Sequence, residues 1–184
     1  MTRLRHYAVT AVFAVLAACD AQNTDHLLAP EADLITSNAP DVVKTKTIVR
    51  GNRVTGLIQP TGGSVSVDGN TLNVPAGAVG QPTWFSMQVV EGSVVHVRLK
   101  AWRAADGAAV TQFPNVAVEL TLDASRIEKL DPTGLVIVYL RDGTYDGARE
   151  EVRSIVNQNN WTVTGYLTHF SSYALAREFS PGID

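Results

Sequence analysis

The chain has few of the residues that brace small exported proteins or hold metal ions. Its 184 residues include one cysteine, Cys19, so a disulfide within the chain is excluded. The four histidines, His6, His26, His96 and His169, are scattered, and none has a cysteine or a second histidine at a zinc-ligand spacing. We therefore expect neither a bound metal nor another cofactor.

The N-terminal hydrophobic stretch is too short to span a membrane. It runs from Ala8 to Leu16, about half of the roughly 20 residues that a spanning helix needs. Arg3 and Arg5 precede it without an acidic residue, and small residues follow it. A charged start, a short apolar segment and a small-residue end are typical of a secretory signal.

The end of this segment, Leu16-Ala17-Ala18-Cys19, resembles the lipobox of bacterial lipoproteins. The resemblance implies that residues 1–18 are a signal peptide, that the Cys19 sulfur receives a diacylglyceryl group, and that cleavage occurs before Cys19. The protein would then be exported and held in the bacterial cell envelope by membrane lipid. Asp20 resembles an inner-membrane retention signal of enteric bacteria, and the choice between inner and outer membrane stays open.

Positive charge is scarce in the rest of the chain. Removing residues 1–18 would remove two arginines and no acid, which takes the net charge from −3 to −5. Nucleic acids and anionic lipid surfaces are bound by basic patches, so we expect neither as a partner of the folded part. An envelope protein or a glycan is the expected partner.

The composition changes along the mature chain. Residues 19–46 hold the cysteine, two prolines and many small polar residues without a sustained period, which predicts a flexible tether. Residues 47–178 are predicted to form the folded domain, and residues 179–184 a C-terminal tail. The length suits one domain on a tether.

Apolar and polar residues alternate in the predicted domain, as in half-buried strands of an antiparallel sheet. The alternation predicts strands within residues 64–74, 84–89, 95–101 and 116–122. Residues 135–140, LVIVYL, are apolar throughout, which is typical of a central strand. Turn residues separate these segments, and one helical turn is predicted at 125–130. The expected fold is all-β, an antiparallel β-sandwich.

The alternation also assigns side chains to faces of the predicted sheets. In residues 95–101, Val97 and Leu99 are expected to face the core, whereas His96, Arg98 and Lys100 are expected on the opposite face.

Both ends of the domain resemble the ZU-five domain of zonula occludens protein, netrin receptors and ankyrins. The first end carries Gly62-Gly63 and the turn Pro75-Ala76-Gly77-Ala78, and the second carries residues 168–173, THFSSY. The resemblance spans about residues 56–177, and between the two ends only the spacing of the predicted strands is similar. The resemblance implies a β-sandwich that works through contacts, with no cofactor and no enzymatic activity.

Some animal members of that family cleave themselves between Phe and Ser of a His-Phe-Ser tripeptide, here His169-Phe170-Ser171. Carried over, Ser171 Oγ would attack the Phe170 carbonyl and turn the amide into an ester that water opens, with His169 accepting the serine proton. Residues 169 and 171 would point to the same side of an extended strand. The alternative to self-cleavage is a structural role, in which hydrogen bonds from His169 and Ser171 fix the conformation of the chain at the start of the strand.

Two weaker patterns complete the set of candidate sites. Trp84, Trp102 and Trp161 would form a sugar-stacking surface if they were exposed together, or else pack in the core. Asp142, Asp146 and Glu150 are predicted to lie in one loop. A calcium loop begun at Asp142 would need an oxygen-rich third ligand and a glutamate twelve positions along, where the chain has Thr144 and Arg153, so we predict a hairpin loop there. The leading hypothesis is a lipid-anchored, non-enzymatic interaction domain; the alternatives are a self-cleaving domain and a carbohydrate-binding module.

Overall fold

The computed structural model describes residues 42–127, 133–141, 143–145 and 149–178. All of them belong to one compact unit. The predicted signal peptide, Cys19, most of the predicted tether and the tail at 179–184 lie outside the described residues.

The described residues form thirteen strands and no helix. The strands are β1 (Lys44–Val49), β2 (Arg53–Ile58), β3 (Gly63–Val67), β4 (Asn70–Val74), β5 (Thr83–Val89), β6 (Gly92–Val94), β7 (His96–Arg103), β8 (Val118–Asp123), β9 (Leu135–Leu140), β10 (Arg149–Val152), β11 (Ser154–Asn157), β12 (Thr162–Leu167) and β13 (Ser172–Arg177). In this part of the chain, no helix has the length and hydropathy needed to cross a bilayer. The helical turn predicted at 125–130 lies partly outside the described residues.

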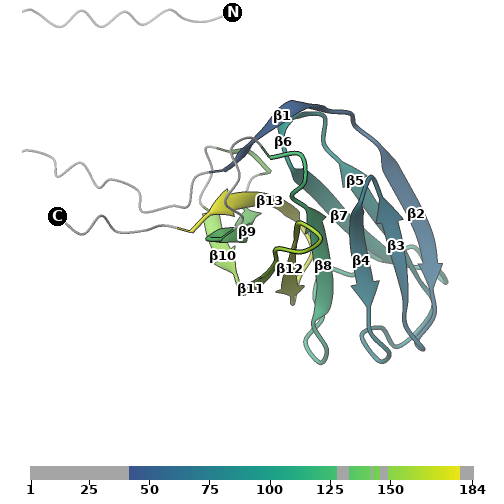
Figure 1. Ribbon diagram of the computed structural model, residues 1–184. Helices are drawn as coiled ribbons and strands as arrows, with labels where there is room; N and C mark the ends of the chain where they lie inside the picture. Colours follow the sequence, from purple (N-terminus) through teal and green to yellow (C-terminus); the bar gives the residue numbers. More distant parts are fainter. Residues whose placement is uncertain (1–41, 128–132, 142, 146–148, 179–184) are drawn as a thin grey trace, which may run out of the picture. The chain divides into compact units, whose positions relative to one another are not determined.

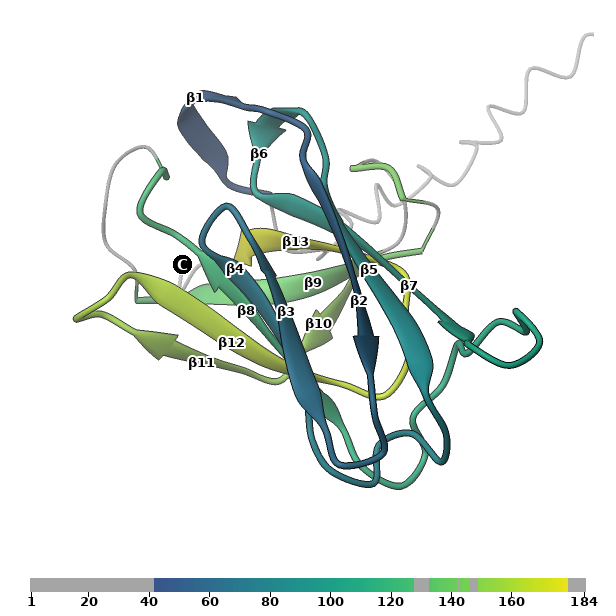
Figure 2. The same cartoon turned by 90° about the vertical axis from the view of Figure 1, so that its right-hand side faces the viewer.

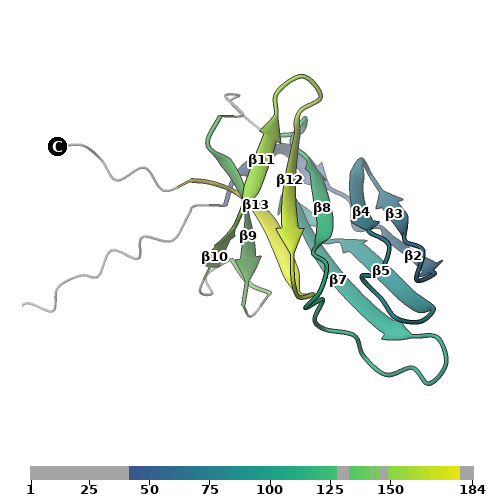
Figure 3. The same ribbon diagram turned by 90° about the horizontal axis from the view of Figure 1, so that it is seen from below.

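Strands β1 and β6 pair in a separate two-stranded sheet, and the other eleven strands form two facing antiparallel sheets. One has the order β10-β9-β13-β7-β5-β2 and the other the order β11-β12-β8-β4-β3 (Figure 1). Seen from below, the two sheets are separate layers (Figure 3). The all-β prediction and the antiparallel β-sandwich are therefore confirmed. The LVIVYL segment is β9, which has a strand on either side, as expected for an apolar run.

The core lies between the two sheets and is built from the alternate residues that face inward. Met87 and Val97 come from the six-stranded sheet and Leu72 and Leu120 from the five-stranded one, and all four side chains are fully buried. Burying apolar surface is the main favourable term in folding, so this double layer stabilises the domain. One broad core therefore fixes which face of each strand points outward.

A second apolar cluster covers part of the outer surface of the six-stranded sheet. Its members lie on β6, β9 and β13: Val94, Val138, Leu140, Ala174 and Ala176. Partly buried Val42 and Tyr145 pack against it. The short ribbon of β1 and β6 lies beyond the ends of β2 and β7 (Figure 2). Strand β1 includes residues 44–46, which the sequence assigned to the tether.

The hairpin predicted after β9 is present, because β9 and β10 pair antiparallel from Leu140↔Arg149 to Ile137↔Val152. Asp142 and Asp146 in its loop lie outside the described residues, whereas Glu150, predicted in the loop, is on β10 opposite Tyr139. A second hairpin joins β3 to β4 through Asp68 and Gly69, both at positive φ. Aspartate and glycine tolerate this left-handed conformation better than most residues, which explains the turn there.

Candidate functional site

The connection from β12 to β13 carries residues 169–171 and is fastened by main-chain hydrogen bonds on two sides. Phe170 N–H donates to the oxygen of Thr111 at 2.9 Å. Leu99 N–H, on β7, donates to the oxygen of Ser171 at 2.8 Å. The peptide bond between Phe170 and Ser171 is therefore held between β7 and the segment that precedes β8.

The Phe170 ring anchors this connection in the core. Its centroid lies 4.6 Å from that of Phe113 and 5.6 Å from that of Phe85, the second contact being edge to face. Both partners are fully buried. Aromatic pairs in these geometries add about 0.5–1.5 kcal/mol beyond the area they bury. The side chain of the predicted scissile residue thus has a packing role.

The His169 ring faces two tyrosines. Tyr173 Oη donates to the main-chain oxygen of His169 at 2.6 Å and lies 3.2 Å from its Nδ1. The ring of Tyr139 stands edge-on to the imidazole at a centroid distance of 4.8 Å. Burial, followed by the charges of Tyr139 and Glu150, raises the pKa of Tyr173, so its hydroxyl stays protonated and able to donate.

The predicted base, His169, and the predicted nucleophile, Ser171, line different hollows. His169 lines a cavity of about 180 Å³ with Tyr139, Glu150 and Tyr173. Ser171 lines a different and larger groove. Among the contacts of the described residues, none joins the imidazole of His169 to the Ser171 hydroxyl. The chain bends at residue 171, before β13 begins, so the rule for an extended strand does not apply to this pair.

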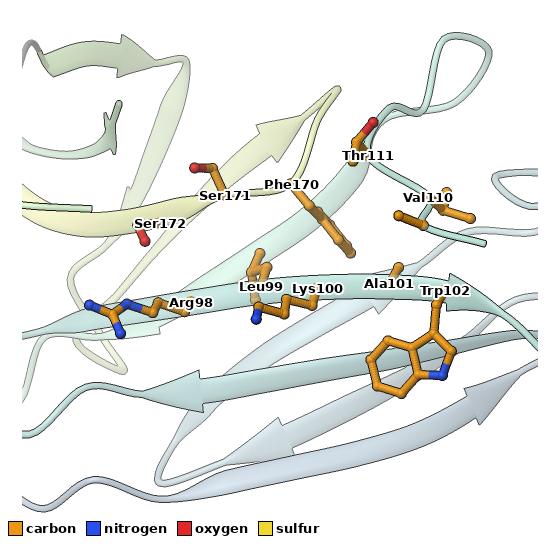
Figure 4. Close-up of a pocket in the computed structure, with 11 residues that line it drawn as sticks. Arg98, Leu99, Lys100, Ala101, Trp102, Val110, Thr111, Phe170, Ser171 and Ser172 are labelled. Carbon is orange, nitrogen blue, oxygen red and sulfur yellow. The ribbon is translucent and has the colours of Figure 1, made fainter. Parts of the chain in front are cut away.

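The larger groove has a volume of about 440 Å³ and opens where β13 separates from β7 (Figure 4). The two strands pair only from Ser172↔Arg98 to Ala174↔His96. Further along β7, residues 108–110 take the place of β13, and Val110 N–H donates to the oxygen of Ala101 at 2.9 Å. In Figure 4, Phe170 and Ala101 point toward each other across this space.

Two tryptophans occupy paired positions on the outer surface of the six-stranded sheet. Trp84 on β5 pairs directly with Trp102 on β7, and Leu57 on β2 continues the row on the other side of Trp84. Trp84 is 37% exposed and Leu57 42%. Directly opposed side chains on one sheet face lie about 4.5–5.5 Å apart at Cβ, so the three residues form one row across β2, β5 and β7.

Trp161 lies elsewhere. It occupies the turn between β11 and β12 at φ 56°, and its oxygen accepts a hydrogen bond from Ala124 N–H at 2.8 Å. The three-tryptophan surface considered from the sequence is therefore reduced to the pair on β5 and β7.

Positive side chains lie beside this aromatic pair. Arg53, Arg98 and Lys100 line a shallow hollow of about 130 Å³ together with Thr55, Ser86, Gln88 and Trp102. Arg98, Lys100 and Trp102 also line the groove beside Ser171, so the two hollows share these three residues of β7. We call the surface made by Arg53, Arg98, Lys100, Trp84 and Trp102 the basic–aromatic face.

His96 lies on the same outer surface, as the alternation predicted, but it is not exposed to solvent. Its side chain is 1% exposed and lies under Tyr145, whose Oη is 3.2 Å from Nδ1. Its Nε2 has no hydrogen-bond partner among the described residues. Burial and the nearby charge of Arg98 lower the pKa of His96 to about 4, so the ring is neutral at neutral pH.

The sequence assigned Arg98 and Lys100 to the outer surface but missed Arg53 and Gln88 as their neighbours. Arg53 Nη2 donates to Gln88 Oε1 at 2.7 Å, and Gln88 pairs with Arg98 across β5 and β7. The only sequence signal was the outward parity of each residue, because the register between β2, β5 and β7 is not written in any one segment.

Within residues 42–178 as described, no group of three or more His, Cys, Asp or Glu side chains is arranged to hold a metal ion. No protein-family model matches the sequence, and a search of curated proteins gives no match.

Proposed function

We propose that this protein is a lipid-anchored protein of the bacterial cell envelope whose β-sandwich is a non-enzymatic interaction domain. The observation that carries the proposal is the segment Leu16-Ala17-Ala18-Cys19, placed directly after a charged and apolar N-terminus. The described domain begins near residue 42, so about two dozen residues separate it from Cys19. A spacer of this length lets a folded domain stand off a bilayer.

The chemistry of the anchor follows from the single thiol. A diacylglyceryl thioether on Cys19 supplies two acyl chains, and each buried methylene contributes about 0.8 kcal/mol. One chain gives reversible binding, whereas two or more hold a protein stably in a membrane. In this proposal the protein is anchored in the inner or the outer membrane of the envelope, and its domain has been exported across the cytoplasmic membrane.

We also propose that the β-sandwich is a ZU-five-like domain. Two features of the described domain support it. The Gly62-Gly63 pair opens β3 with Gly62 at φ 88°, and Gly77 in the Pro75–Ala78 turn adopts φ 79°. The His169–Tyr173 segment leads into the last strand, as the resemblance implies.

Metabolic labelling with a fatty-acid probe tests the anchor. We expect the native chain to be labelled and to fractionate with membranes, and Cys19→Ser to lose both properties. A matched control carries Ser37→Cys in the Cys19→Ser background, which keeps one thiol but places it outside the lipobox. An unlabelled native protein that is recovered in the soluble fraction would contradict the proposal, as would equal labelling of the control.

The absence of self-processing is tested separately by the mass of the purified protein under denaturing conditions. Because His169 faces Tyr173 while Ser171 lines another groove, we expect the bond between Phe170 and Ser171 to stay intact. A fragment that begins at Ser171, lost in Ser171→Ala but retained in Ser172→Ala, would establish the self-cleaving alternative instead.

A further inference from the structure

The basic–aromatic face is positively charged on a chain that carries net negative charge. Arg53, Arg98 and Lys100 all project from it, and among the described residues no carboxylate lines their hollow. The one ion pair found among the described residues joins Arg103 to Asp106, outside this hollow. Exposed cations that are not neutralised by neighbours create a local positive potential that attracts anions.

The cations and the tryptophans are spaced along β7 in successive rows. Arg98, Lys100 and Trp102 are alternate residues of one strand, so neighbouring rows are about 7 Å apart and the outer two about 13 Å apart. Arg53 lies in the Arg98 row, linked to it through Gln88, and Trp84 lies in the Trp102 row. The face is therefore an elongated surface with an aromatic end and a cationic end.

We propose that the basic–aromatic face binds an acidic polysaccharide, one whose sugar units carry carboxylates. This inference rests on the proposed role of the sandwich as an interaction domain and names its partner. The apolar faces of sugar rings would stack on Trp84 and Trp102. Carboxylates farther along the polysaccharide would accept hydrogen bonds from Lys100 and Arg98. Arginine presents a planar fork that matches a carboxylate in two parallel hydrogen bonds.

The number of cations favours a polysaccharide over other polyanions. Proteins bind duplex DNA mainly by neutralising its phosphates with Lys and Arg, and polybasic lipid sites use clusters of about 4–8 Lys and Arg. The face offers three cations, the amide of Gln88 and two tryptophans at paired positions of β5 and β7. A few placed charges beside an aromatic surface suit a ligand with sparse charge and apolar ring faces.

Affinity electrophoresis of the full chain in detergent tests the inference. Polygalacturonate is the probe, and its fully methyl-esterified form is the ligand control, because it keeps the sugar chain and removes the charge. We expect polygalacturonate to retard the native protein and to shift its tryptophan fluorescence, with weaker binding at higher salt. The esterified polymer is expected to bind at least about tenfold more weakly.

Two charge reversals localise the site. Lys100→Glu is expected to weaken the retardation at least about tenfold, because it places a negative charge between the aromatic and arginine rows. Lys46→Glu, at an exposed position on β1 outside the face, is the matched control and is expected to bind like the native protein. Trp84→Ala is expected to weaken binding and to reduce the fluorescence shift.

Four results would overturn the inference. They are no retardation by polygalacturonate, equal binding of the esterified polymer, equal losses in Lys100→Glu and Lys46→Glu, and binding only to phosphatidylglycerol vesicles or duplex DNA. Loss of lipid labelling at Cys19 would leave these binding results unchanged, so the anchor and the glycan site can fail independently.

Discussion

At the scale of single residues, the imidazole of His96 is buried outside the main core, and its Nε2 has no hydrogen-bond partner among the described residues. It lies among side chains of the second apolar cluster, with Ala174 opposite it on β13 and Tyr145 above it. A protonated ring there would be desolvated and close to Arg98, so protonation is unfavourable in the folded state. His96 therefore links stability to pH.

The pKa of His96 is about 4 in the folded protein and 6.5 in the unfolded chain, so the unfolded chain binds more protons between these values. We expect the free energy of unfolding to fall as pH falls from about 6.5 to 4, by at most roughly 3 kcal/mol from this residue. His96→Leu should flatten this part of the profile, measured by urea unfolding at each pH. A variant with the native pH profile would show that His96 is not the group responsible.

At the scale of elements, turns and strand faces follow from short stretches of sequence. The Asp68-Gly69 turn, the apolar LVIVYL strand and the outward position of Arg98 and Lys100 all agree with the sequence, because alternation and turn chemistry are local properties. The place where β13 separates from β7 and residues 108–110 replace it is not specified locally. Residues 108–110 fold back on Ala101, while Ser171 and Ser172 hold the other part of β7. No pattern within either segment specifies that pairing, and the groove exists because of it.

The turn before β3 gives an element-scale prediction. Gly62 has φ 88°, and an added Cβ would lie 2.7 Å from the oxygen of Val74 and 2.9 Å from the nitrogen of Ala76. Gly107 has φ 71° with open space around it, so Gly107→Ala is the matched control for backbone strain alone. We expect Gly62→Ala to lower the free energy of unfolding by about 2–3 kcal/mol and Gly107→Ala by about 1 kcal/mol, measured in urea.

Equal losses in the two glycine variants would mean that the backbone around Gly62 relaxes without cost. In that case the contact between this turn and the end of β4 does not constrain the hairpin.

At the scale of the whole molecule, the aromatic cluster of Phe85, Phe113 and Phe170 joins parts of the chain that are far apart in sequence. It ties β5 to the segment before β8 and to the connection between β12 and β13. The same connection forms one wall of the groove beside β7. Packing in this cluster therefore supports both the stability of the sandwich and the shape of its candidate site.

Phe85→Ala is expected to lower the free energy of unfolding by about 3–5 kcal/mol, because a fully buried ring is removed from contact with two others. Leu57→Ala, at a side chain 42% exposed on the neighbouring strand, should change it by about 0.5 kcal/mol or less. Chemical unfolding followed by tryptophan fluorescence measures both. A small loss in Phe85→Ala would show that the cluster collapses around the missing ring.

Strand periodicity, turn residues and the N-terminal signal pattern are properties of neighbouring residues, so the all-β class and the proposal of a lipid anchor could be drawn from the chain alone. The register of β2, β5 and β7 pairs Trp84 with Trp102 and places Arg53 in the same row as Arg98. A bend at residue 171 affects how His169 and Ser171 are placed. The burial of His96 depends on a loop and on strands distant in sequence. Such contacts form between segments whose own patterns are satisfied by many pairings, and only packing of the complete sandwich selects one.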